Sequence, residues 1–145
     1  MKNAIVFTCA CLFTLACGGA ETESDAPPTG DTSIGSVSIV TPISGATLSG
    51  TTVEVQLAST VTILPAGDMT AGSGHHHLYL DADLTEAGVP VPSIPGSIVH
   101  MGDASSTFVF EGLSPGVHRL IAVVADGVHM PLQPWVVDTV TFTVN

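Results

Sequence analysis

Three separated segments of the chain carry most of its histidines, and imidazole is the commonest protein ligand for metal ions. A triplet, His75-His76-His77, stands near the middle of the chain. The tripeptide Val-His-Met then occurs twice, at residues 99–101 and 128–130. Neutral imidazole suits copper, zinc and nickel, and thioether sulfur adds a preference for Cu(I). These residue types therefore predict a metal site, with copper expected first and zinc bound by three histidines as the alternative.

The histidine triplet opens a predicted β-strand, because apolar and polar residues alternate from Leu78 to Asp81. Alternation places His75 and His77 on one face of the strand, with Cα atoms about 7 Å apart. Both imidazoles can reach one ion from that spacing. His76 falls on the opposite, apolar face, where we expect a buried and hydrogen-bonded histidine rather than a ligand.

The rest of the chain predicts a β-sandwich that positions these residues. From residue 36 onward, short runs with strand-like alternation are separated by turns rich in Gly and Pro, and no run has a helical period. We expect seven strands, at residues 37–41, 51–59, 75–82, 97–101, 105–111, 117–125 and 135–144. Seven short strands are typical of an immunoglobulin-like antiparallel β-sandwich. Its expected core includes Phe108, Leu120, Val124, Val140 and Phe142.

In an immunoglobulin-like sandwich, alternate connections gather at the same end of the two sheets. That end would collect the predicted metal ligands, which are His75, His77, His100, His129, Met101 and Met130. Three carboxylates are expected to orient the imidazoles as hydrogen-bond acceptors, namely Asp81, Asp103 and Asp126. His118 falls at the other end, where we expect a corner residue that is hydrogen-bonded to the backbone.

Composition excludes several classes of function. The chain has 145 residues, 45% of them hydrophobic, and a formal net charge of −11 with only two cationic residues. No basic patch exists for nucleic acid. All three cysteines lie within the first seventeen residues, so the body of the chain has no disulfide and no cysteine-based zinc site. We find no nucleophile elbow and no selected carboxylate pair, so we predict no enzyme and rank a zinc-dependent hydrolase last.

The N-terminal residues predict export and membrane anchoring. Residues 1–17 combine Lys2, a short apolar run and Cys17, which is the pattern of a secretory signal. The Leu15-Ala16-Cys17-Gly18 junction resembles the bacterial lipoprotein signal, and this resemblance implies lipidation of Cys17 as the mature N-terminus. Residues 18–35 are rich in Pro, Gly, Ser, Thr and acidic residues, and they read as a flexible tether to a domain at 36–145. The expected location is the envelope of a bacterial cell.

The segment Gly74-His75-His76-His77-Leu78, with Asp81 beyond it, resembles an exported bacterial family known as domain of unknown function 4399. Similar features recur through residues 36–145, at Pro42-x-x-Gly45-Ala46-Thr47-Leu48, His100-x-Gly102, Pro115-Gly116-x-His118-x-Leu120 and Asp126-x-x-His129-x-Pro131. A further histidine often follows the Pro131 position in the family, where this chain has Leu132-Gln133. The resemblance implies the fold more than a function, because the family has no settled activity.

Two function hypotheses from different classes remain open on the sequence. The first is an exported, lipid-anchored protein that binds copper for buffering, delivery or sensing. The second is a structural immunoglobulin-like module for adhesion or assembly, in which the histidines are a hydrogen-bonded feature without metal.

Overall fold

The computed structural model describes residues 34–145. The predicted signal at 1–17 and nearly all of the predicted tether at 18–35 lie outside this range. None of the described residues forms a helix, so this part of the chain contains no helix that could cross a membrane. Its nine strands are β1 (Val37–Thr41), β2 (Thr47–Leu48), β3 (Val53–Ser59), β4 (Thr62–Ile63), β5 (Ser73–Leu80), β6 (Ile98–Met101), β7 (Thr107–Phe110), β8 (Gly116–Ala125) and β9 (Val137–Val144).

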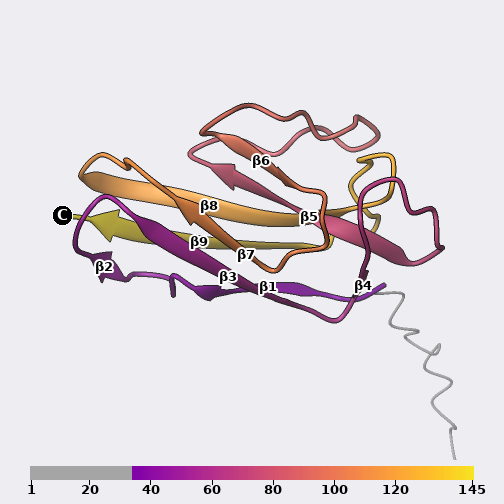
Figure 1. The fold of residues 1–145 in the computed structure, drawn as a ribbon, viewed down its shortest axis with the longest axis horizontal. Coiled ribbons are helices and arrows are strands. Elements are labelled where there is room, and N and C mark those ends of the chain that lie inside the picture. The colour runs from indigo at the N-terminus through magenta and orange to yellow at the C-terminus, as the bar shows by residue number, and fades with distance from the viewer. Residues whose placement is uncertain (1–33) are drawn as a thin grey trace, which may run out of the picture. The chain divides into compact units, whose positions relative to one another are not determined.

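The strands form two layers, as Figure 1 shows. The smaller sheet has the order β1-β3-β7, and the larger sheet has the order β2-β9-β8-β5-β4, with β6 also paired to β5. All pairings between the longer strands are antiparallel, whereas β2 and β4 each make a short parallel pairing. The predicted all-β sandwich is therefore confirmed. The structure has all seven expected strands and two additional strands of two residues each, β2 and β4.

The position of β6 differs from a constant-type immunoglobulin domain, in which the fourth strand belongs to the same sheet as the first, second and fifth. Here β6 lies beside β5 in the larger sheet. The register of this pair sets His77 opposite His100 and His76 opposite Met101. Cross-strand partners share one face of a sheet, so this pairing decides which of these side chains can meet.

The main core lies between the two layers. Inward-facing residues of β3 alternate with exposed ones, as the apolar alternation of this strand predicts. Four of the five predicted core residues are buried, namely Leu120, Val124, Val140 and Phe142. Phe108 is only partly buried, because β7 is an edge strand of the smaller sheet. It packs edge-on against Phe110, with ring centroids 4.9 Å apart.

A second apolar core covers the outer face of the larger sheet. The connection between β5 and β6 runs above this face in Figure 1 and contributes Val91 to the layer. Tyr79, Ile121 and Val123 are buried beneath it. As a result, every residue of β5 is buried, including the three histidines. The proline-rich connection at 81–97 thus gives β5 an apolar environment on both faces.

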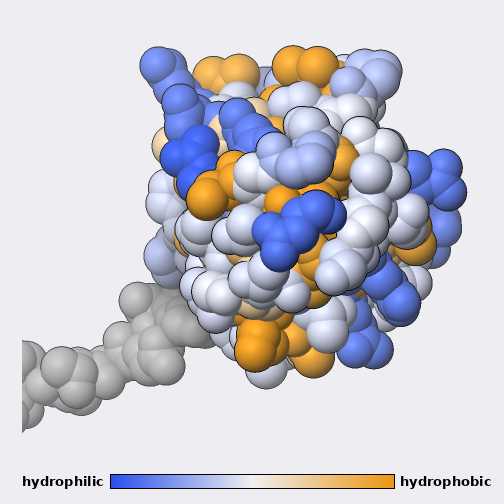
Figure 2. Space-filling model, turned by 90° about the vertical axis from the view of Figure 1, so that its left-hand side faces the viewer, coloured by the Kyte–Doolittle hydropathy of each residue, from blue (hydrophilic) through white to orange (hydrophobic). Residues whose placement is uncertain are grey.

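The end of the domain near the C-terminus has a mixed surface. Figure 2 views the end near the C-terminus, where apolar and hydrophilic residues alternate over the surface without one continuous apolar face. Arg119 is exposed, as expected for the strand face opposite Leu120. Its guanidinium donates hydrogen bonds to the carboxylate of Asp83 at 2.6 Å and to the carbonyl of Ala82 at 2.9 Å.

Candidate metal centre

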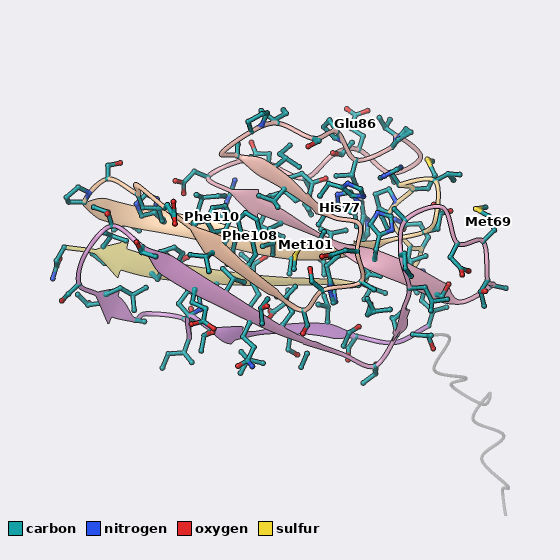
Figure 3. All side chains as sticks on the ribbon, in the orientation of Figure 1. Met69, His77, Glu86, Met101, Phe108 and Phe110 are labelled. Atoms are coloured by element: carbon teal, nitrogen blue, oxygen red, sulfur yellow. The ribbon has the colours of Figure 1, made fainter. Side chains whose placement is uncertain are left out.

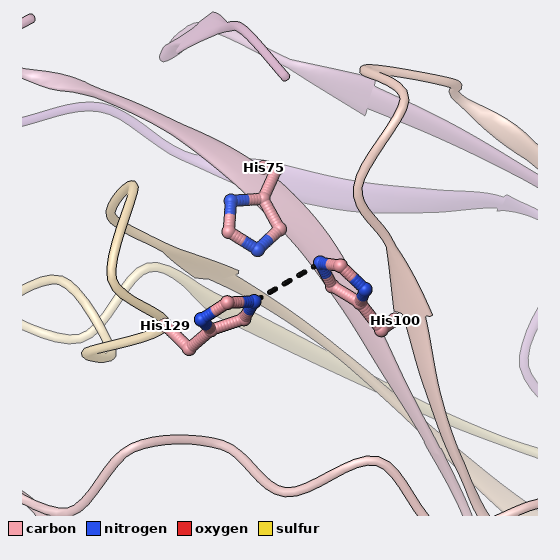
Figure 4. A group of neighbouring side chains, drawn as sticks. All are labelled: His75, His100 and His129. Atoms are coloured by element: carbon pink, nitrogen blue, oxygen red, sulfur yellow. Dashed lines mark hydrogen bonds between the residues drawn. The ribbon is translucent and has the colours of Figure 1, made fainter. Parts of the chain in front are cut away.

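Four imidazoles from three separated segments form one cluster on the outer face of the larger sheet. His75 and His77 come from β5, His100 from β6, and His129 from the connection between β8 and β9. All ring centroids within this imidazole cluster lie between 4.8 and 5.7 Å from one another. Figure 4 shows a ring nitrogen of His75 directed toward the contact between His100 and His129. The four predicted histidine ligands therefore lie together.

The distances within the imidazole cluster suit a metal ion. The Nε2 atoms of His75 and His77 are 3.0 Å apart, and those of His100 and His129 are 3.2 Å apart. One ligand nitrogen from each of His75, His100 and His129 lies within 4.8 Å of the other two. A tetrahedral zinc ion bound at 2.0–2.1 Å holds its nitrogens about 3.3 Å from one another. Two pairs already have nearly this separation, and the group of three whose nitrogens all lie within 4.8 Å comprises His75, His100 and His129 without His77.

The strand registers explain how three of these rings meet. His75 and His77 share a face of β5, and His77 pairs with His100 across the β5–β6 ladder. Gly102 leaves the space that the His100 ring occupies, since a Cβ on this residue would lie 2.6 Å from Nε2 of His100. Reasoning from the sequence singled out His100-x-Gly102 only as a family feature and did not identify this steric role.

A tight turn after β8 holds His129 in place. Its φ of 70° lies in the left-handed region, which is uncommon for a residue with a side chain. The carboxylate of Asp126 accepts hydrogen bonds from the N–H groups of Val128 and Met130, both at 2.9 Å. The carbonyl of His129 accepts a bond from the N–H of Val91 in the covering connection, also at 2.9 Å. Such strained residues persist where the surroundings fix them, as these bonds do here.

Burial favours the neutral form of the imidazoles that binds metal. Burial, and after it the neighbouring histidines, together lower the pKa of His75 to about 4 and that of His77 to about 3. The pKa of His100 is also lowered, first by burial and then by His129. These three rings are consequently neutral at pH 7. No proton has to leave a charged imidazole before an ion binds them.

Met101 does not lie with the imidazole cluster, which corrects its prediction as a nearby ligand. It pairs with His76, is 3% exposed and belongs to the core between the sheets. Figure 3 shows His77 and Met101 on opposite sides of the larger sheet. The physical reason is the period of two along β6, which turns consecutive side chains to opposite faces. Met130 is half-buried in the same loop as His129.

The hydrogen bonds of the three predicted carboxylate partners go to groups outside the imidazole cluster, which corrects their expected role. Asp81 accepts hydrogen bonds from His118 at 2.7 Å and from the N–H of Arg119 at 2.8 Å. Asp103 accepts one from the N–H of Ser105 at 3.0 Å, and Asp126 holds the turn described above. The side chain of an aspartate readily accepts a hydrogen bond from the backbone N–H group two residues further along the chain. Asp103 and Asp126 make this local bond rather than a bond to an imidazole of the cluster.

The other two histidines have the structural roles that were expected of them. His76 is 1% exposed, and its Nδ1 lies 3.0 Å from the carbonyl oxygen of Ser105. His118 donates from Nε2 to the carbonyl of Ser114 at 2.9 Å and from Nδ1 to Asp81. The bond to Ser114 raises the pKa of His118, burial opposes this rise, and Asp81 adds to it. His118 is thus a corner residue bonded to the backbone, as predicted.

The solved structures that match this chain have little sequence identity to it. No curated protein matches the chain. Among solved structures, an engineered protein from a structural genomics consortium is 12% identical, with a TM-score of 0.42, and the match covers 77% of this chain and 20% of that protein. The extracellular domain of a protein described as a one-component system from B. thetaiotaomicron is 9% identical, with a TM-score of 0.42 over 72% of this chain and 12% of that one.

This chain therefore spans only a fifth or less of the length of either solved protein. A family model matches residues 53–145, and this range holds the whole imidazole cluster. The family resemblance seen at the histidine triplet is confirmed by this match. The chain belongs to the family described as Domain of unknown function (DUF4399).

Proposed function

We propose that this protein binds a transition metal ion through His75, His100 and His129, with His77 as a fourth nitrogen donor. The observation that carries the proposal is the convergence of four imidazoles from three separated segments on one partly buried site. Nitrogen-only sites bind first-row divalent ions most tightly at copper. We therefore propose Cu(II) as the preferred ion and Zn(II) as the next. The position of Met101 in the core removes one of the thioethers that favoured Cu(I).

A purely structural role explains the imidazole cluster less well. The Nδ1 atoms of His75 and His77 are buried, and neither has a hydrogen-bond partner among the described residues. Burying polar atoms without a partner costs about 1–3 kcal/mol each. Apolar side chains of similar size would fill the same space without this cost. Nε2 of His76, outside the cluster, is also buried without a partner, so the feature that favours a metal site is the convergence of the Nε2 atoms of the four clustered histidines.

Metal titration tests this proposal directly. Protein purified without an affinity tag, and stripped of metal, is titrated with Cu(II), Zn(II) and Cu(I) against competing chelators of known affinity. We expect one ion per chain, with Cu(II) bound most tightly. The matched control is a variant in which all four histidines of the imidazole cluster are replaced by glutamine. Equal affinities of the variant and the natural protein would refute the proposal and favour the structural module.

We also propose that the protein is a lipoprotein of a bacterial envelope, anchored to a membrane through Cys17. The support is the Leu15-Ala16-Cys17-Gly18 junction after a short apolar run. Mass spectrometry of the mature protein should find an acylated N-terminal cysteine, and the Cys17→Ser variant should lack the acyl mass. A mature protein that begins downstream of Cys17, without lipid, would contradict the proposal. Its task in the envelope would be copper buffering or delivery.

A further inference from the structure

The imidazole cluster divides into two pairs that differ in exposure. His75 and His77 are completely buried, and we call them the inner pair. His100 is exposed and His129 is half-buried, and we call them the outer pair. Each pair is joined by its own Nε2–Nε2 contact, at 3.0 Å for the inner pair and 3.2 Å for the outer pair. A ligand from solvent therefore meets the outer pair first.

Strands and covering loop enclose the inner pair. Strand β5 is flanked by β8 on one side and by β6 on the other, and the second apolar core lies on the same sheet face. Because both rings are fully buried, neither can reach solvent unless its neighbours are displaced. His100 lies on the edge strand β6 and is exposed, so its ring can move with little disturbance of the fold, whereas the turn at Asp126 fixes the backbone of His129.

Two carboxylates act on the imidazole cluster from nearby. Asp103 follows His100 closely in the chain and acts on its charge, and Asp126 acts on His75 from the turn that holds His129. The net charge of the whole chain is −11. These charges attract a free cation toward the site and disfavour an anionic ligand that competes for it. A molecule that takes the metal ion from this site should therefore have a positively charged surface and bind the ion through neutral nitrogen or sulfur atoms.

We propose that the outer pair is an exchange face, through which the bound ion passes directly to an acceptor with neutral nitrogen or sulfur donors. This inference rests on the proposed metal binding. Bonds between the acceptor's donor atoms and the ion form one after another, while the bonds from the ion to Nε2 of His100 and then to His129 break, and those to His75 and His77 break last. The imidazole leaves in its neutral form, and the oxidation state of the ion does not change. His75 and His77 retain the ion until the acceptor holds it.

Transfer kinetics test the exchange face. The full mature protein is loaded with Cu(II) at constant buffered pH and mixed with excess triethylenetetramine, a chelator that is cationic near neutral pH and releases protons as its amine nitrogens bind Cu(II), while the visible absorption of the bound ion is followed. We expect the transfer rate to rise in proportion to the chelator concentration. His100→Gln should raise the second-order rate constant about tenfold, because an open coordination position then faces solvent. His77→Gln should lower the affinity but change this rate constant much less.

Separate outcomes overturn the two proposals. A transfer rate that does not depend on chelator concentration means that the ion leaves by opening of the fold, and it overturns the exchange face alone. Equal changes in the rate constant for His100→Gln and His77→Gln do the same. Absence of Cu(II) binding by the natural protein overturns both proposals. If His77→Gln does not fold, the concentration dependence of the natural protein still decides the question.

Discussion

Replacing His129 with glutamine should weaken Cu(II) binding by more than the 10- to 100-fold that is typical when a group that merely orients a ligand is lost. The substitution removes one of the three nitrogens that lie within 4.8 Å of one another. Glutamine keeps much of the side-chain volume, and the turn is held by N–H bonds to the Asp126 carboxylate that do not involve the side chain of His129, so the turn should persist. Equilibrium competition titration of the variant and the natural protein measures the change.

Two control variants separate this effect from general damage. Met101→Leu conserves volume in the core and should leave the Cu(II) affinity unchanged, because Met101 lies on the other face of the sheet. His118→Gln removes a histidine far from the imidazole cluster in the fold and should act on stability alone. A loss of affinity in Met101→Leu equal to that in His129→Gln would contradict the assignment of ligands.

The metal-free protein should lose stability as the pH falls from about 6.5 toward 3. An unfolded chain protonates its histidines near pH 6.5, whereas folded His75 and His77 take up protons only near pH 4 and pH 3. In that window the unfolded state binds more protons, so lowering the pH favours unfolding. His118 has the opposite sign, because its pKa is raised. Its contribution is complete below pH 6.5 and is lost as the pH rises through the raised pKa.

Urea unfolding between pH 7.5 and pH 4 measures this dependence. The natural protein should show a free energy of unfolding that falls with pH, and the double variant His75→Gln and His77→Gln should show a smaller slope. Asp81→Asn serves as the control at the other end of the domain, where it weakens the partner of His118 without touching the inner pair. A double variant with the same slope as the natural protein would show that the inner pair is not held neutral by burial.

The alternation of residues along β5 was enough to predict which histidines share a face. His75 and His77 meet on one side, and His76 lies in the core on the other, as a period of two requires. The same rule, applied to residues 99–101, separates His100 from Met101. Met101 was nevertheless predicted as a ligand, because both residues were assigned to one end of the sandwich without asking which face each one occupies.

Other features depend on contacts that a single sequence does not show. The pairing of β6 with β5 rather than with β7 depends on contacts between strands that are distant in sequence. This pairing sets His100 opposite His77. The proline-rich connection at 81–97 was expected to be irregular, but nothing in its composition shows that it covers β5 and anchors the loop of His129. The steric need for Gly102 likewise appears only once the ring of His100 is in place.

Electron paramagnetic resonance of the Cu(II)-loaded protein tests the central claim most directly, because hyperfine coupling counts the nitrogens bound to the ion. The imidazole cluster predicts a spectrum with three or four equivalent imidazole nitrogens at one ion per chain. Single histidine-to-glutamine variants of His75, His100 and His129 should each remove one nitrogen. A spectrum with one bound imidazole or none, or one that is unchanged in these variants, would contradict the account.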